Sequence, residues 1–542
     1  MTKCLPKSAL LPLRTLPECL KTYFSIDDAT LTGYMIVHIK HHYCPLASFP
    51  RMINFEVRPL WGSQPTPFRH TWKGLVNIDQ FRWLVRADVH EQLALAAQEL
   101  GARLVRAVGM LDDEMRVLTA DPTRWRKDGK LHEEPNWQIV TMIFERLLNL
   151  GIHPMVTTCF MPGAIAAGSR TVFETKARIS MPACMKQWRT LVGSLVRHLA
   201  RHFGHEVIRK CYFEVWNEPN LQNGFFEGGK EDFFELYRNT ASAIKEVDST
   251  FKVGGPSTAR AEWMLDFLDF CRSQDLEPDY IIGHIYNNDN DSKPLSPFDG
   301  PQEDLISRSP HFAAGVVRGT RKILDEAGFQ GEIHWNEWGR SWFPCDILRE
   351  TSNEAAFIVK TMAEVSQLGD YFAYWCLSDI YDQVGYGRQA FHGNYGLLSL
   401  QGLRKPGYHA FQLLGMMGEQ QIKVEGNGLG KLTNAIATTS ACHSEVLIYA
   451  FDDMDQAAGD RSFTVILPPR QRLQKLYRIT ESENNIVSRW KAMGSPCYIN
   501  PVQATQLKQS NLLTETTDYV CDDITVKFTL SSPGVALLTF SY

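Results

Sequence analysis

The stretch Tyr-Phe-Glu-Val-Trp-Asn-Glu-Pro-Asn at residues 212–220 determines how the rest of the sequence is interpreted. Its first half is rich in aromatic and β-branched residues, which is the composition of a buried strand. Asn217, Glu218, Pro219 and Asn220 then place polar groups and a chain-turning proline where such a strand would end. A carboxylate beside an amide and an indole is poor material for a core, but it suits holding a sugar ring and moving a proton.

A second stretch, residues 333–338, repeats this order of residue types. A short apolar strand is followed by Asn336, Glu337 and the aromatic Trp338. The pair of carboxylates, Glu218 and Glu337, is the main indication of function.

Short apolar runs alternate with amphipathic helical patterns from about residue 70 onward. We expect strands at residues 75–78, 103–108, 154–160, 211–217, 252–256, 280–286, 332–338 and 371–377. Apolar residues at helical spacing, clearest at residues 188–203, predict a helix after each strand. Eight such units predict an α/β fold, the (β/α)8 or TIM barrel, whose parallel strands are continuously apolar. A doubly wound sheet would need a glycine-rich phosphate turn after an early strand, and the sequence has none.

The sequence divides into three parts. After about residue 419 the helical pattern gives way to β segments at residues 446–451, 463–467, 524–528 and 535–540, which predicts a small accessory β-sandwich. Two early strand-like runs, residues 34–39 and 53–57, are expected to complete this sandwich. We therefore expect amino-terminal strands at 1–65, the barrel at 66–418 and the carboxy-terminal sandwich at 419–542.

Composition limits the classes of partner. The 542 residues are 44% hydrophobic and 22% charged, with a net charge of −5, which argues against a nucleic-acid groove or an anionic membrane surface. No apolar run has the length of a membrane span, and the first 25 residues lack the apolar segment of a secretory signal. The 12 cysteines are scattered without a CxxC pair. This pattern is typical of reduced thiols and predicts a cytoplasmic setting.

In a (β/α)8 barrel the active site lies at the carboxyl ends of the strands, where Glu218, Glu337, His284 and Tyr286 are all expected. Cleavage of a glycosidic bond needs one protonated carboxyl and one ionised carboxylate. Glu218, beside an indole and an apolar strand, suits the acid, and Glu337 suits the nucleophile. Asn217 is placed to donate to a sugar 2-hydroxyl, and Tyr286 and His284 to orient the carboxylate of Glu337.

Other polar residues have structural interpretations. A glutamate at a strand end can also cap a helix or bind an arginine. Glu214, inside the strand, is expected to pair with a buried arginine such as Arg106. His198, His202 and His205 are helically spaced but lack the glutamate of a zinc-protease helix, so they indicate a helix end.

Residues 213–220 resemble the acid/base motif of glycoside hydrolase family 39. This family belongs to a large clan of retaining (β/α)8 enzymes, and its members include β-xylosidases and, more distantly, α-L-iduronidases. Further stretches similar to this family follow in order across residues 70–415: 105–109, 160–162, 253–256, 283–286, 374–379, 391–393 and 405–411.

The resemblance implies a retaining double displacement with Glu218 as acid/base and Glu337 as nucleophile, their carboxyl groups about 5–5.5 Å apart. It implies no metal and no organic cofactor, and a small oligosaccharide or glycoside as substrate, with a homo-oligomer as a possible assembly. The substrate-binding residues that we expect are Asn217, His284, Tyr286, Phe160, Trp375 and Asp382.

The sequence departs from the family around the sugar site. Val108 stands where many members have a sugar-contacting histidine, and Asn336 and Gly339 stand where a threonine and an asparagine flank the nucleophile. Asp382-Gln383, preceded by Tyr381 in place of a phenylalanine, replaces an acidic pair. An exo-acting β-xylosidase is the first hypothesis. The same mechanism on a β-glucoside, β-galactoside or α-L-arabinopyranoside and a non-catalytic sugar-binding protein stay open. An α-L-iduronidase would need basic residues for a uronate.

Overall fold

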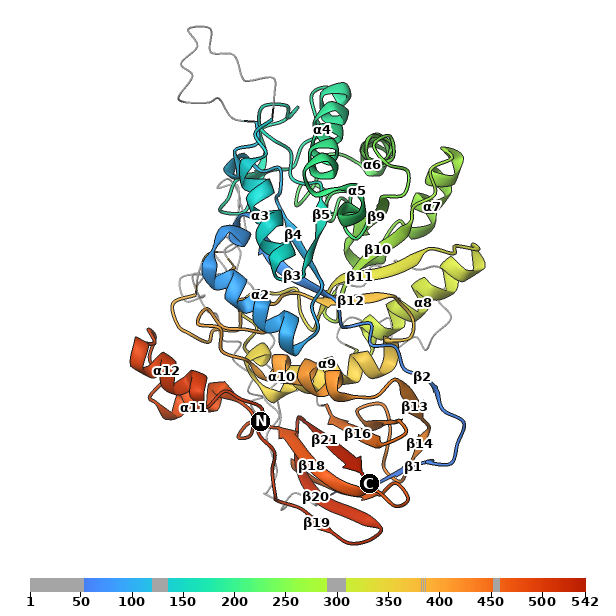
Figure 1. The fold of residues 1–542 in the computed structure, drawn as a ribbon, viewed down its shortest axis with the longest axis vertical. Coiled ribbons are helices and arrows are strands. Elements are labelled where there is room, and N and C mark those ends of the chain that lie inside the picture. Colours follow the sequence, from blue (N-terminus) through green and yellow to red (C-terminus); the bar gives the residue numbers. More distant parts are fainter. Residues whose placement is uncertain are drawn as a thin grey trace, which may run out of the picture.

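The structure is a computed structural model that describes residues 53–118, 135–289, 309–381, 383, 385, 387–451 and 459–542. The strand expected at residues 34–39 lies outside these residues, as does Asp382. The protein consists of a barrel and a sandwich, with two helices of the barrel, α9 and α10, between them (Figure 1).

Eight parallel strands form the barrel sheet in chain order. They are β3 (Leu75–Gln80), β4 (Leu104–Val108), β5 (His153–Thr157), β8 (Tyr212–Glu214), β9 (Lys252–Thr258), β10 (Tyr280–Tyr286), β11 (Glu332–Gly339) and β12 (Tyr371–Tyr374). The ends of the sheet meet where the backbone N–H of Leu377 donates to the carbonyl of Asn77 at 2.9 Å and the Asn77 amide donates to the carbonyl of Ala373 at 3.2 Å. The predicted fold class is confirmed.

One long helix follows each barrel strand and covers the outside of the sheet (Figure 1). These helices are α2 (Ala87–Glu99), α3 (Gln138–Asn149), α4 (Met185–Phe203), α6 (Lys230–Lys245), α7 (Met264–Ser273), α8 (Phe312–Glu326), α9 (Ser352–Val365) and α10 (Pro406–Met416). Shorter elements are the hairpin β6 (Thr171–Val172) and β7 (Ala177–Arg178) and the helix α5 (His205–Ile208). All seven residues of β10 are buried, as expected for a strand with covered faces.

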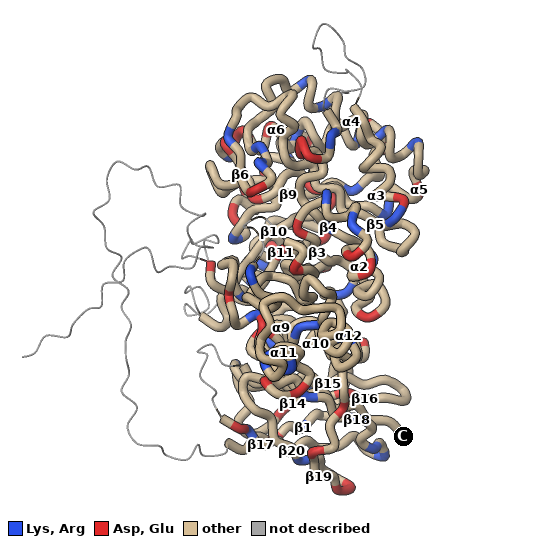
Figure 2. Tube along the Cα trace, turned by 90° about the vertical axis from the view of Figure 1, so that its left-hand side faces the viewer, with Lys and Arg blue, Asp and Glu red and all other residues tan. Residues whose placement is uncertain are grey.

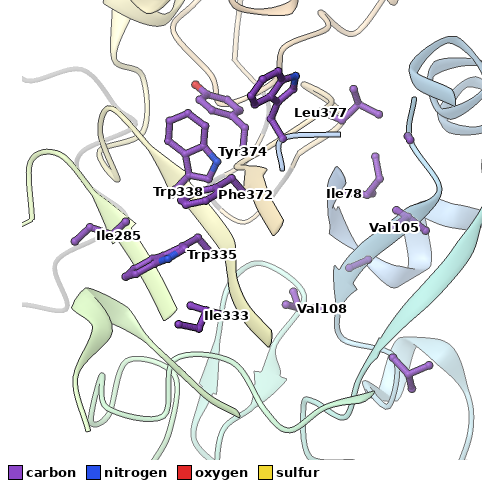
Figure 3. Packing of buried hydrophobic residues seen from close by; sticks show 14 of the residues in the cluster. Ile78, Val105, Val108, Ile285, Ile333, Trp335, Trp338, Phe372, Tyr374 and Leu377 are labelled. Carbon is purple, nitrogen blue, oxygen red and sulfur yellow. The ribbon is translucent and has the colours of Figure 1, made fainter. Parts of the chain in front are cut away.

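Apolar side chains fill the space between the barrel strands and the helices. Trp335, Trp338, Phe372 and Tyr374 from the neighbouring strands β11 and β12 lie together in this core (Figure 3). The rings of Trp338 and Tyr374 meet edge to face at 5.5 Å.

A smaller apolar cluster lies at the amino ends of the barrel strands. It comprises Leu75, Leu104, Met155, Tyr212, Tyr280, Ile282 and Ala373, from six of the eight strands. Because this cluster plugs one end of the barrel, polar side chains further along the same strands collect toward the carboxyl ends.

The second domain is a sandwich of two sheets. One has the order β14 (Val424–Glu425), β1 (Ile53–Pro59), β17 (Gly459–Ile466), β20 (Thr525–Ser532) and β19 (Val520–Cys521). The other has β18 (Arg472–Ile479), β21 (Gly534–Ser541), β16 (His443–Ala450), β15 (Thr433–Thr439), β13 (Gln420–Ile422) and β2 (Thr66–Pro67). The run at residues 53–57 therefore joins the sandwich as expected, and β2, just past the expected boundary at residue 65, does so too by pairing with β13.

Two short helices interrupt the second domain where only β segments were expected. α11 (Ile486–Ala492) and α12 (Pro501–Gln509) lie between β18 and β19. Trp490 of α11 meets Phe391, which follows the last barrel strand, at 5.3 Å. The helices thus pack on the barrel and not within the sandwich.

Hydrogen bonds connect the two domains. The hydroxyl of Ser352 in α9 donates to the carbonyl of Pro533 at 2.7 Å, and its backbone N–H donates to Glu481 at 2.9 Å. Basic and acidic residues are scattered over both domains (Figure 2). Among the described helices, none combines the length and apolar character needed to cross a bilayer.

Candidate active site

Glu218 and Glu337 face one cavity of about 290 Å³ at the carboxyl ends of the barrel strands. Glu218 follows β8 and Glu337 belongs to β11, and each residue is only 7% exposed. A carboxylate oxygen of each lies within 4.8 Å of one of the other. The sequence prediction that these two side chains meet is confirmed by this geometry.

The backbone leaves the sheet abruptly before Glu218. Trp216 and Glu218 have left-handed φ angles of 65° and 47°, which non-glycine residues adopt only where surrounding contacts impose them. The backbone N–H of Glu218 donates to the carbonyl of Ser257 at 2.9 Å. The side chain of Asn220 accepts from the backbone N–H of Ala259 at 2.9 Å and donates to its carbonyl at 3.0 Å. The segment that carries Glu218 is therefore fixed to the end of β9.

Glu337 is surrounded by donors that favour its ionised form. The hydroxyl of Tyr286 donates to Oε1 at 2.7 Å, and Nη1 of Arg106 donates to Oε2 at 3.1 Å. Burial raises the pKa of Glu337, while the charge of Arg106 and the hydrogen bond from Tyr286 oppose that rise. These two donors favour Glu337 as the carboxylate of the pair.

Glu218 has a different environment. Its Oε1 lies 3.0 Å from Nδ1 of His284. Burial raises the pKa of Glu218 to about 7, so a substantial fraction of the carboxyl is protonated at neutral pH. Burial also lowers the pKa of His284 to about 4, which leaves its ring neutral. The raised pKa of Glu218 suits a general acid, and the donors around Glu337 suit a nucleophile.

Arg106 is the central cation of the site and is fully buried. It forms two hydrogen bonds with Glu214, at 2.7 and 3.1 Å, as the sequence analysis expected. Its Nη2 also donates to Oδ1 of Asn217 at 2.6 Å. Because that oxygen is the acceptor, the NH₂ group of Asn217 is the part of the amide that can donate into the cavity, which Asn217 lines.

The other predicted substrate-binding residues lie in different places. Tyr286 and Trp375 line the cavity. His284 was expected to orient Glu337, but its Nδ1 is closer to Glu218, at 3.0 Å, than to Glu337, at 3.6 Å.

Phe160 does not belong to the cavity wall. It is fully buried, and its ring meets that of Trp216 edge to face at 5.6 Å. Its side chain therefore supports the indole that precedes the acid/base segment, and its expected contact with a sugar stays a prediction.

Several wall residues were not singled out by the sequence. They are Leu221, Phe225, Ala259, Arg260, Asp289, Trp342 and Tyr395. All lie in segments that connect a barrel strand to its long helix, and Phe225 and Tyr395 lie far along these segments. Their sequences have no periodic pattern, so the position after a strand was the only available signal. Val108 and Gln383, which depart from the family pattern, also line the cavity.

Glu218, His284 and Glu337 place donor atoms within 4.8 Å of one another, a spacing at which a cation could also be held. The hydrogen bonds from Tyr286 to Glu337 and between His284 and Glu218 also hold these side chains in this arrangement.

Comparisons with known proteins agree with this geometry. The family model described as glycosyl hydrolases family 39 matches residues 59–516. A β-xylosidase of Caldicellulosiruptor saccharolyticus is 32% identical over 445 residues, which are 82% of this chain and 88% of that protein. A β-xylosidase of Geobacillus stearothermophilus is 27% identical over 479 residues, 87% of this chain and 92% of that protein.

Among solved structures, the crystal structure of a monomeric β-xylosidase from Caulobacter crescentus CB15 is similar, with a TM-score of 0.76 and 26% identity. The match covers 90% of this chain and 99% of that one.

Proposed function

The chain belongs to glycosyl hydrolase family 39 and is a glycoside hydrolase, and from that premise we propose that it is a retaining exo-β-xylosidase acting on short xylo-oligosaccharides. One observation carries the mechanistic part of the proposal: the oxygens of Glu218 and Glu337 approach within 4.8 Å inside one cavity. Retaining enzymes hold their carboxyl groups about 5–5.5 Å apart, whereas inverting enzymes leave about 6.5–9.5 Å for a water molecule.

Each residue has a defined part in the double displacement. In the first step an oxygen of Glu337 bonds to the anomeric carbon while the proton of Glu218 passes to the leaving oxygen. In the second step Glu218 takes a proton from water, whose oxygen displaces Glu337. Arg106 and Tyr286 stabilise the carboxylate of Glu337 as it departs, and the NH₂ group of Asn217 donates to the sugar 2-hydroxyl.

The choice of a xyloside follows from the relatives and from the cavity. Both curated relatives described above are β-xylosidases, and a cavity of about 290 Å³ encloses the end of a substrate. Arg260 is a cation in the wall that could pair with a uronate, but its Nη2 lies 2.9 Å from Glu262, which balances its charge. This favours a neutral sugar over an acidic one.

A panel of 4-nitrophenyl glycosides tests the sugar. The β-xyloside is expected to have the highest kcat/KM, ahead of the β-glucoside, β-galactoside and α-L-arabinopyranoside. ¹H NMR of the first product should show the β-anomer, because two inversions retain configuration. A first product with α configuration contradicts the mechanism. Binding of xylo-oligosaccharides without turnover would instead indicate a non-catalytic sugar-binding protein.

A cytoplasmic site of action is part of the same proposal. The nine cysteines in the described part of the chain are all free, as thiols are in a reducing compartment. Its test is the fractionation of cells that express the natural gene. A homo-oligomer stays a prediction, which sedimentation of the purified protein would test.

A further inference from the structure

The proton of Glu218 is connected to a buried hydrogen-bond path formed by Glu214, Ser257 and His284. Nδ1 of His284 lies 3.0 Å from Glu218, Nε2 of His284 lies 3.3 Å from Oγ of Ser257, and Oγ of Ser257 hydrogen bonds with Glu214. All three residues of the path are 0% exposed. The donor and the acceptor of each hydrogen bond in this path follow from the state of Glu214, at the end of the path opposite Glu218.

Glu214 is ionised and accepts every hydrogen bond that it makes. Its donors are Nε and Nη2 of Arg106, Oγ1 of Thr157 at 2.6 Å, Nδ2 of Asn336 at 2.9 Å and Oγ of Ser257. Although burial opposes ionisation, the charge of Arg106 holds the pKa of Glu214 below its usual value. An ionised carboxylate can only accept, so the hydroxyl hydrogen of Ser257 points at Glu214.

A serine hydroxyl has a single hydrogen. Since Ser257 uses it for Glu214, its oxygen can only accept from His284, and Nε2 of His284 must carry a hydrogen. The ring is neutral, so Nδ1 presents a lone pair. A lone pair 3.0 Å from Glu218 is a favourable contact only if Glu218 donates, which requires the carboxyl to be protonated.

We propose that Ser257 is a positioning residue that, together with Glu214, fixes His284 as the tautomer with hydrogen on Nε2 and so keeps the catalytic proton on Glu218. The path also assists the second step. After Glu218 gives its proton to the leaving oxygen, its carboxylate faces the lone pair of Nδ1, which makes it a stronger base toward the attacking water. The kinetic part of this inference rests on the proposed function.

Other charges act on Glu218 as well, and the test must leave them unchanged. The charged groups are Arg106 on β4, Glu214 on β8, Arg260 in the 3-10 helix η4 (Ala259–Ala261), Asp289 after β10 and Glu337 on β11, and the neutral titratable groups are His284 and Tyr286 on β10. Ser257→Ala removes none of these charges. Ser257 has a φ of 57°, and alanine carries the same Cβ as serine, so the substitution adds no branch at this strained position.

The experiment measures kcat/KM against pH for Ser257→Ala. Without the serine, His284 can place its hydrogen on Nδ1 and donate to an ionised Glu218, which lowers the pKa of Glu218. The alkaline limb of the profile is then expected to move to lower pH by roughly one unit, the effect of one hydrogen bond of ordinary net strength. Activity should fall more for a methyl xyloside, which needs acid assistance, than for a 2,4-dinitrophenyl xyloside.

Thr157→Val is the matched control. It also removes one hydroxyl donor from Glu214, but Thr157 bonds to Oε2 and has no contact with His284 on the path. Its alkaline limb is expected to stay in place. A limb that moves equally in both variants, or stays in place in Ser257→Ala, overturns the inference.

A second measurement reads the wild-type protein directly, needs no turnover and uses a variant only for assignment. Long-range ¹H–¹⁵N NMR of the wild-type protein, with His284 assigned through a His284→Gln sample, should show hydrogen on Nε2 and none on Nδ1. Hydrogen on Nδ1 overturns the inference. If the protein hydrolyses no glycoside, the proposed function fails, while this spectrum still supports or overturns the path.

Discussion

Tyr286→Phe isolates the contribution of one hydroxyl group to the state of Glu337. The hydroxyl donates to Oε1 at 2.7 Å inside a buried site. A hydrogen bond to a charged group contributes about 1.5–3 kcal/mol, and one pKa unit corresponds to about 1.36 kcal/mol. Removing the hydroxyl destabilises the ionised form, so the pKa of Glu337 should rise by about one to two units.

The acid limb of kcat/KM against pH should therefore move to higher pH by the same amount. Deglycosylation should also slow by about 10- to 100-fold, because the departing carboxylate loses a donor that the ester form did not need. Slower deglycosylation lets the glycosyl-enzyme accumulate. Mass spectrometry of protein quenched during turnover should show a larger glycosylated fraction than in the wild type.

Tyr395→Phe provides the control for this experiment. Tyr395 also lines the cavity with a buried ring, but its hydroxyl donates to the backbone carbonyl of Trp342. The acid limb of kcat/KM against pH for Tyr395→Phe should match that of the wild type. If Tyr286→Phe has the wild-type acid limb and no excess of glycosyl-enzyme, then Tyr286 does not stabilise the ionised nucleophile and the reasoning fails.

Three further outcomes test the site and its support. Glu218→Ala should lose activity on methyl xyloside by several orders of magnitude and regain turnover of an activated aryl xyloside with azide, giving a β-glycosyl azide; an α-azide would contradict retention. Phe160→Ala should lower the free energy of unfolding by about 3–5 kcal/mol, measured by urea denaturation, while KM changes little if the ring only supports Trp216. Arg106→Met leaves Glu214 buried and unpaired, so stability should fall by about 3–5 kcal/mol near neutral pH; a wild-type urea midpoint would refute that.

The barrel could be predicted because each of its strands is a continuous apolar run. The observed bounds of a strand differ from the predicted ones where the chain presents a functional group. The strand expected at 211–217 is only Tyr212–Glu214 in the structure, since Trp216 and Glu218 take left-handed conformations. Ser257 shows that a strand can contain a left-handed residue, since its φ is 57° within β9, so residue types alone do not reveal where the chain departs from the sheet.

The direction in which each side chain points limited how much of the site could be predicted from the sequence. Glu337 and Tyr286 were placed correctly because strand ends converge in any (β/α)8 barrel. Phe160 packs against Trp216 and is not among the residues that line the cavity, whereas Arg260 lines it from a turn with a φ of 58°. Neither fact follows from strand position, because the loop backbone after the last paired residue decides where each side chain points.

The helices α11 and α12 were missed for a different reason. α11 has seven residues and buries only Ile486, Val487 and Trp490. So short a segment has too few turns to show a helical period, and its stability comes from the barrel surface that it covers.

The position of β1 has a consequence for how the chain folds during synthesis. Phe55 of β1 is opposite Phe463 of β17 in a parallel pair, and the whole barrel lies between them in sequence. A ribosome must therefore translate the entire barrel before β1 meets its partner, whereas the strands and helices of the barrel follow one another directly. The barrel can complete its folding while β1 is still unpaired, and the sandwich forms only after its later strands have been synthesised.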